Sequence, residues 1–244
     1  MLASAADRPS DGCLGTPDII AGFNSRGPAA TPDGLIVKPD MTAPGVNVNS
    51  SVPCDETGCG FAFFQGTSMA TPHLAGSAAA LIWDGGWQDA DDFVPTPLPS
   101  DFDNPRDEQV KSLLVNSSLD GVVMDHVTGT NLVNVNDEGS GRLELVGAFN
   151  EVFYADPVAF NVGRVGRGAP SGSATVTFSG EVGTLTANST APTLAGVSAN
   201  VDVVGNTVTL TLMRDRGVRG DTEGVVTVSN GTTSMHLVYF ARFE

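Results

Sequence analysis

The sequence predicts a mixed α/β fold over residues 1–152, followed by a small all-β sandwich over residues 156–244. Two patterns predict this division. Short strand candidates precede a helix of almost only apolar or small residues, Met69–Trp83. After Asp156, apolar and polar residues alternate with a period of two. With 244 residues, 41% of them hydrophobic, the chain can bury a core in one large domain or two smaller ones.

Short strands separated by turns are predicted before the helix. Residues 7–18 are rich in Pro, Gly, Asp and Ser and predict a loop, and further breaks fall at Gly27-Pro28 and Pro44-Gly45. The strand candidates are residues 2–6, Ile19–Phe23, Leu35–Val37, Val46–Val48 and Phe61–Phe64.

The apolar helix ends at Gly85-Gly86, and because it is apolar all round, we expect it to be buried on every side. Residues 84–105 are rich in Asp and Pro and predict a surface loop. Two further helices are predicted: an amphipathic one over Asp107–Leu114, with Val110, Leu113 and Leu114 inward, and a short one over residues 143–152, after Gly139-Ser140-Gly141.

The β-sandwich is predicted from its alternation and from one hairpin. Thr207, Thr209 and Thr211 alternate with Val208, Leu210 and Leu212, and a similar pattern runs through residues 174–178. Asn230-Gly231 lies between two apolar runs, which is a strong hairpin signal. Several such strands in so short a segment suggest a sandwich near the lower size of immunoglobulin-like domains.

The formal charge of -16 disfavours anionic partners, since such a surface repels nucleic acid and anionic lipid. No apolar run approaches the roughly 20 residues needed to cross a bilayer, so no membrane role is expected. Residues 1–7 do not combine a basic region with a long apolar stretch, so any secretory signal is expected upstream.

Three cysteines allow one disulfide. Cys54 and Cys59 bracket a short loop and are predicted to pair, leaving Cys13 free, although free thiols at all three positions remain an alternative. A zinc site is disfavoured, because His73, His126 and His236 do not lie at metal-finger spacing from the cysteines.

The stretch Gly66–Gly76 carries the clearest chemical signal. A strand candidate runs through a glycine turn, and Ser68 stands where the buried helix begins. The helix N-terminus offers free N–H groups and a partial positive charge, which would stabilise an oxyanion, and Pro72 is tolerated if it falls in the first turn. An ordinary Ser cap is the alternative on these mechanics alone.

The string from Gly66 to Gly76 resembles the nucleophile motif of the subtilase family, Gly-Thr-Ser-Met-Ala-x-Pro-His-x-x-Gly, at every specified position. Three flanking segments resemble family segments in order and spacing: Phe23–Pro28, Lys38–Gly45 and Gly139–Ala148. The resemblance covers about residues 1–152 and implies the second half of a doubly wound, mostly parallel subtilisin-like sheet. The sandwich resembles accessory domains of secreted subtilases, without a motif.

The resemblance implies a serine endopeptidase acting on protein or peptide substrates, with Ser68 as nucleophile. Family order is Asp, His, then Ser, yet no histidine precedes Ser68. His73 matches a family histidine with a packing role, and His126 and His236 follow the serine, which breaks the order. The oxyanion Asn is also missing. The expected partner is therefore the N-terminal half of the catalytic domain.

The resemblance requires no cofactor but allows structural calcium, which many subtilases bind. Asn134, Asn136, Asp137 and Glu138 offer oxygen ligands, but they do not match an ordered calcium loop, so a solvated acidic turn is favoured. The same interpretation applies to the aspartates of residues 89–103.

Secretion is expected, with a signal peptide upstream of this chain. The alternative to an enzyme is an inactive remnant, in which Ser68 has no function and the sandwich binds protein or glycan.

Overall fold

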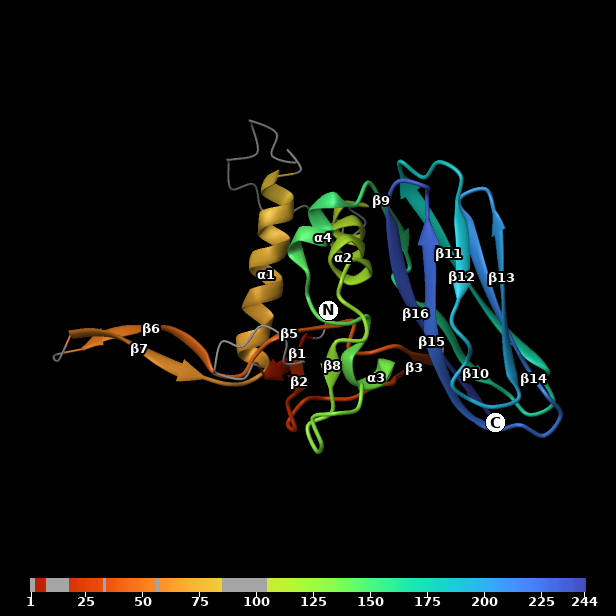
Figure 1. Cartoon of the computed structure of the whole chain (residues 1–244), viewed down its shortest axis with the longest axis horizontal. Helices are drawn as coiled ribbons and strands as arrows, with labels where there is room; N and C mark the ends of the chain where they lie inside the picture. The colour runs from red at the N-terminus through yellow and green to blue at the C-terminus, as the bar shows by residue number, and fades with distance from the viewer. Residues whose placement is uncertain (1–2, 8–17, 33, 56–57, 85–104) are drawn as a thin grey trace.

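The computed structural model describes residues 3–7, 18–32, 34–55, 58–84 and 105–244 (Figure 1). The predicted loops over residues 7–18 and 84–105 therefore lie almost entirely outside the described residues, as do the aspartates of residues 89–103. No described helix is long and apolar enough to span a bilayer.

A small mixed sheet and two hairpins form the strands of the α/β part. The sheet has the order β5-β1-β2-β8, in which β1–β5 and β2–β8 are parallel and β1–β2 is antiparallel. The two hairpins pair β3 with β4 and β6 with β7. The bounds are β1 Ala3–Asp7, β2 Asp18–Ile20, β3 Ala29–Thr31, β4 Gly34–Ile36, β5 Met41–Pro44, β6 Val48–Asp55, β7 Gly58–Phe64 and β8 Val123–Met124.

Most pairings of the described strands are antiparallel, but in the sheet β5-β1-β2-β8 two of the three pairings are parallel. The predicted doubly wound, mostly parallel arrangement is therefore not confirmed as a whole. Short connections explain the difference, because a tight turn joins only antiparallel neighbours, whereas parallel strands need a long crossover. The coarser prediction of a mixed α/β fold is confirmed. Strands outnumber helices among the described elements.

The described helices complete this part: α1 (Thr67–Asp84), α2 (Pro105–Asn116), α3 (Val135–Glu138) and α4 (Leu145–Asn150). The predicted amphipathic helix is confirmed, since Val110, Leu113 and Leu114 of α2 are all buried. They pack in one hydrophobic cluster with Met41 of β5 and with α1 and α4. Helix α4 is shorter than predicted, and α3 was not predicted.

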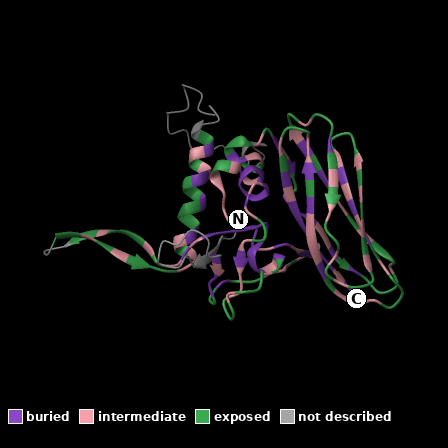
Figure 2. Ribbon diagram, viewed as in Figure 1, coloured by how far each residue is buried: buried purple, intermediate pink, exposed green. Residues whose placement is uncertain are grey.

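Helix α1 is buried on one side only, so the prediction that it is buried on every side is wrong. Ala70, Leu74 and Leu81 lie on the buried stripe, one or more turns apart, and join the cluster with α2. The small residues Ala75, Gly76 and Ala79 are exposed, as the green stretches of α1 show in Figure 2. The described chain packs elements against one face of this helix and leaves the other uncovered.

The carboxyl-terminal part consists of two four-stranded sheets, ordered β10-β16-β15-β12 and β13-β14-β11-β9. The two sheets lie beside each other in Figure 1, and side chains from both form one hydrophobic cluster. The bounds are β9 Phe153–Asp156, β10 Phe160–Val165, β11 Ser171–Gly180, β12 Thr186–Ser189, β13 Val197–Val204, β14 Thr207–Arg214, β15 Gly220–Ser229 and β16 Ser234–Phe243.

The alternation and the hairpin predicted in this part are confirmed. Val208, Leu210 and Leu212 of β14 are fully buried, and β15 and β16 pair antiparallel around Asn230-Gly231. Strand β9 starts before Asp156, pairs with β11 and buries Phe153 in the common cluster. It therefore pairs within the sheets, and it begins in the gap between the predicted ranges 1–152 and 156–244.

The two parts meet in a packed junction. Leu35 and Val37 of the α/β part share a buried cluster with Val238 and Phe240 of β16. Polar contacts reinforce the junction, for example the Val37 N–H, which donates to Asn161 Oδ1 at 2.8 Å.

Candidate active site

Ser68 stands at the N-terminus of α1, as the sequence predicts. It is exposed and is the second residue of the helix. Gly66 before it has φ +148°, a conformation that L side chains rarely adopt, so a glycine is required at this turn. The Gly66 N–H donates to the Gly45 carbonyl at 2.8 Å, which fixes the turn against the segment after β5. The Ser68 N–H lies in the first turn, where helical N–H groups have no intrahelical acceptor.

Pro72 lies in the second turn of α1 rather than the first, because the helix already begins at Thr67. A proline lacks the N–H that would bind the carbonyl four residues earlier, which here is the carbonyl of Ser68. Neither the N–H nor the carbonyl of Ser68 thus takes part in the regular i to i−4 hydrogen bonds of α1.

A groove opens beside Ser68, with a cavity volume of about 490 Å³, within the range of small-molecule and peptide sites. One wall is the start of α1 and the other is the hairpin β6–β7. The lining residues are Val48, Asn49, Ser50, Ser51, Phe64, Ser68, Met69, Pro72 and His73.

His73 lines the same groove and is exposed, so the predicted packing role is not what the structure shows. It lies on the uncovered side of α1, where no described element packs. Its Nδ1 donates to the Met69 carbonyl at 2.9 Å. Within the described residues, the Ser68 hydroxyl makes no hydrogen bond to His73 or to any other group.

The other two histidines lie away from the groove. His126 Nδ1 is 3.4 Å from the Arg26 guanidinium, and His236 Nε2 donates to the Ser140 carbonyl at 2.6 Å in the junction with the sheets. The groove therefore contains a nucleophile but, among the described residues, no histidine that is hydrogen-bonded to it.

The Lys38-Pro39-Asp40 segment has a structural role. Asp40 is buried and binds Lys38 at 2.5 Å and Lys111 of α2 at 3.3 Å. Burial raises the pKa of the Asp40 carboxyl, but the two lysines outweigh it and hold the pKa below its usual value. A Cβ at Gly139, which has φ +71°, would lie 2.4 Å from the Asp40 carbonyl oxygen, so only glycine allows this approach.

In the acidic turn of residues 134–138 the two carboxylates are buried, not solvated as predicted, whereas Asn134 is exposed. Asn134 caps α3 by accepting the N–H of Asn136, and Arg26 binds Asp137 at 3.1 Å. Asp137 and Glu138 are 5% and 3% exposed. The described residues contain no group of three or more His, Cys, Asp or Glu side chains placed to hold a metal ion.

Glu138 is a group that sequence reasoning missed. Burial and, after it, the nearby charges of Asp120, Asp137 and Glu223 together raise its pKa to about 9. Its Oε2 has no hydrogen-bond partner among the described residues. Asp120 and Glu223 are far from it in sequence, so no local pattern signals this cluster.

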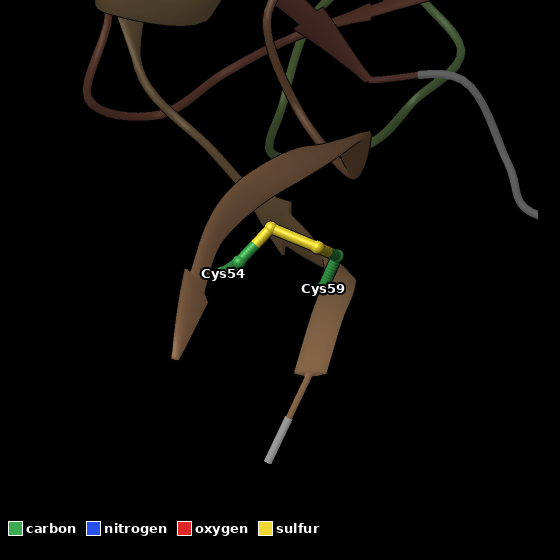
Figure 3. The surroundings of a disulfide bond; sticks show 2 residues. All are labelled: Cys54 and Cys59. Carbon is green, nitrogen blue, oxygen red and sulfur yellow. A yellow bond between two sulfur atoms is a disulfide. The ribbon is translucent and has the colours of Figure 1, made fainter. Parts of the chain in front are cut away.

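The predicted disulfide between Cys54 and Cys59 is confirmed (Figure 3). It joins β6 and β7 near the tip of a hairpin that projects from the rest of the chain (Figure 1). Phe61 and Phe63 of this hairpin are 76% and 70% exposed. Cys13 lies outside the described residues, so its predicted free thiol is not tested.

Replacing both Cys54 and Cys59 by serine is expected to loosen this hairpin. A two-stranded hairpin without other packing is only marginally stable in water, and the disulfide restrains its strands. Hydrogen exchange measured by mass spectrometry should show the amides of residues 48–64 exchanging about tenfold faster, while those of β15 and β16 keep their rates. Unchanged exchange in the hairpin would show that the disulfide does not hold it.

Sequence comparison identifies known proteins that are similar to this chain. The family described as "Subtilase family" matches residues 12–147. "Minor extracellular protease Vpr" of Bacillus subtilis (strain 168) is 30% identical over 151 residues, 59% of this chain and 15% of that protein. Fervidolysin of Fervidobacterium pennivorans is 30% identical over 148 residues, 54% of this chain and 18% of that protein.

Local similarity is higher to pyrolysin of Pyrococcus furiosus, which is 51% identical over 63 residues, 26% of this chain and 4% of that protein. The chain thus spans less than a fifth of the length of each of these three relatives.

Proposed function

This chain belongs to the subtilase family, and we propose that it supplies the nucleophile, Ser68, of a subtilisin-type serine endopeptidase. The observation that carries the proposal is the exposed Ser68 at the N-terminus of α1, within a groove large enough for a peptide segment. The Ser68 oxygen attacks the scissile carbonyl and forms an acyl-enzyme as the amine leaves. Water then releases the acid and restores the hydroxyl.

The Ser68 N–H would stabilise the oxyanion of the tetrahedral intermediate. It belongs to the first turn of α1, where free N–H groups and the helix dipole favour negative charge. The groove wall formed by Val48–Ser51 would hold the peptide beside Ser68. The reaction itself needs no cofactor.

A general base and its orienting acid are proposed to come from a polypeptide outside residues 1–244, the N-terminal half of the catalytic domain. Two observations support this. No described histidine is hydrogen-bonded to Ser68, and the relatives are more than five times longer than the segments matched. The uncovered face of α1, with Ala75, Gly76 and Ala79, offers a close-packing surface for that half.

The proposal extends to fold and location. Residues 1–152 would be completed into a doubly wound, mostly parallel sheet, and the two carboxyl-terminal sheets would form an immunoglobulin- or fibronectin-like accessory sandwich. Secretion is supported by the Cys54–Cys59 disulfide and by the relative named as an extracellular protease.

Labelling with a fluorophosphonate probe tests the proposal. Residues 1–244 alone should not react, because an unassisted serine hydroxyl is a poor nucleophile near neutral pH. The intact protein that includes the N-terminal half should react, and peptide mapping should place the label on Ser68. Ser173→Ala, a change at an exposed serine of β11 outside the groove, should leave labelling unaltered.

Two results would contradict the proposal. Labelling of Ser68 in residues 1–244 alone would mean that His73, His126 or His236 acts as the base. A matured intact protein that hydrolyses casein without reacting with the probe would mean that Ser68 is not the nucleophile.

A further inference from the structure

The charge of this chain is unevenly distributed. Residues 1–152 hold 21 of the 28 acidic residues and six of the 12 basic residues, a formal charge of −15. Residues 153–244 hold seven acidic and six basic residues, a formal charge of −1. All six of these basic residues are arginines, and four of them, Arg167, Arg214, Arg216 and Arg219, line one cavity. We call this region the arginine end.

Two loops build the arginine end, residues 166–170 between β10 and β11 and residues 215–219 between β14 and β15. Strands β11 and β14 pair from Ser171 opposite Met213, so their loops emerge side by side. Together with Glu244 the loops enclose a cavity of about 430 Å³. It lies at the end of the two sheets where the C-terminus is marked in Figure 1.

Arg214 fixes the position of both loops. Its guanidinium donates to the carbonyls of Gly166, Ala169, Val218 and Glu244 at 2.9–3.1 Å. The same group lies 5.2 Å from the centroid of the Phe243 ring. Three of these oxygens belong to neutral peptide groups, whereas the main-chain oxygen of Glu244 belongs to a carboxylate in residues 1–244, so Arg214 mainly positions the loops and the other three arginines carry the free charge.

Three arginines of the arginine end, Arg167, Arg216 and Arg219, are exposed and unpaired. Within the described residues none of them makes an ion pair or a side-chain hydrogen bond. The two arginines of these sheets that do not line the cavity are paired, Arg164 with Glu244 at 3.0 Å and Arg242 with Asp221 at 2.5 Å. Asp215 and Glu244 are the acidic residues of the lining, so four arginine side chains face two acidic side chains, one of which is already paired with Arg164.

We propose that the arginine end binds a short segment of a partner protein that carries several Asp or Glu side chains. The planar guanidinium matches a carboxylate with two parallel hydrogen bonds, and rigid loops present three such groups around one cavity. A long polyanion is disfavoured, because the rest of the chain would repel it. The lining residues include no aromatic ring on which nucleic-acid bases could stack.

Fluorescence anisotropy with a labelled peptide of about eight glutamates, in roughly 20 mM NaCl, tests this binding on residues 1–244. Saturable binding is expected, and it should weaken as NaCl is raised. The double variant Arg216→Gln, Arg219→Gln should bind about tenfold more weakly. The matched control Arg26→Gln, Arg242→Gln lies outside the cavity, has the same charge change and should stay within about twofold of the unaltered chain.

Three outcomes would overturn the proposal: no saturable binding of the acidic peptide, equal loss in both double variants, or tighter binding of a single-stranded RNA or a sulfated glycan of the same charge. Equal loss would mean that net charge alone attracts the peptide. Circular dichroism of both variants verifies that the exposed substitutions leave the sheets folded.

Discussion

Replacing Ser68 by alanine is expected to lower the turnover of the intact protease by about 10⁴- to 10⁶-fold, the range typical for loss of a triad nucleophile in this family. Alanine removes the attacking oxygen but keeps the turn at Gly66 and the first turn of α1. Peptide binding in the groove should therefore be retained. Steady-state hydrolysis of a peptide amide should show kcat falling while KM changes little.

His73→Ala provides the control within the same groove. Its imidazole is bonded to the Met69 carbonyl rather than to Ser68, so kcat should fall less than about tenfold. A loss as large as that of Ser68→Ala would identify His73 as the base and remove the need for the N-terminal half. Full activity in Ser68→Ala would remove Ser68 from the mechanism.

Replacing Glu138 by glutamine is expected to stabilise the chain at alkaline pH. Burial raises the folded-state pKa of Glu138 from 4.5 to about 9. Between these values the folded state keeps a proton that the unfolded state has lost, so the free energy of unfolding falls as pH rises, by about 1.4 kcal/mol per unit. The full stability is present below about pH 4.5, where both states are protonated.

The glutamine amide does not ionise, so the fall in the free energy of unfolding that Glu138 causes at rising pH is absent in Glu138→Gln. At pH 5 the two proteins should have nearly the same stability, and at pH 8 Glu138→Gln should be more stable by about 2–4 kcal/mol. Urea unfolding of residues 1–244 at both pH values measures this. The exposed Glu181→Gln serves as the control and should change stability by less than about 0.5 kcal/mol at either pH. Equal stability of Glu138→Gln and the unaltered chain at pH 8 would mean that Glu138 ionises without cost.

Features that depend on local sequence were predictable. The alternation around Leu210, the hairpin at Asn230-Gly231 and the inward face of α2 follow from periodicity and turn chemistry, and all three are present. The Cys54–Cys59 disulfide followed from spacing within a short loop. The position of Ser68 at a helix N-terminus followed from the glycine turn before it.

Features that depend on distant neighbours were not predictable. Composition alone made α1 look buried all round, yet burial requires a partner on each side, and the described chain supplies one for a single face. The acidic turn looked solvated because carboxylates usually are. Glu138 is buried because the turn packs against β16 and faces Glu223 of β15, which lies far along the chain.

The junction between the two parts also affects how the chain assembles. Val238 and Phe240, which cover Leu35 and Val37, follow them by about 200 residues in the chain. Until β16 has been made, the segment that leads from β4 toward Asp40 and the groove lacks its apolar cover, so its packing waits for the synthesis of β16. The α/β part and the two carboxyl-terminal sheets are therefore expected to complete their folding together, not one after the other.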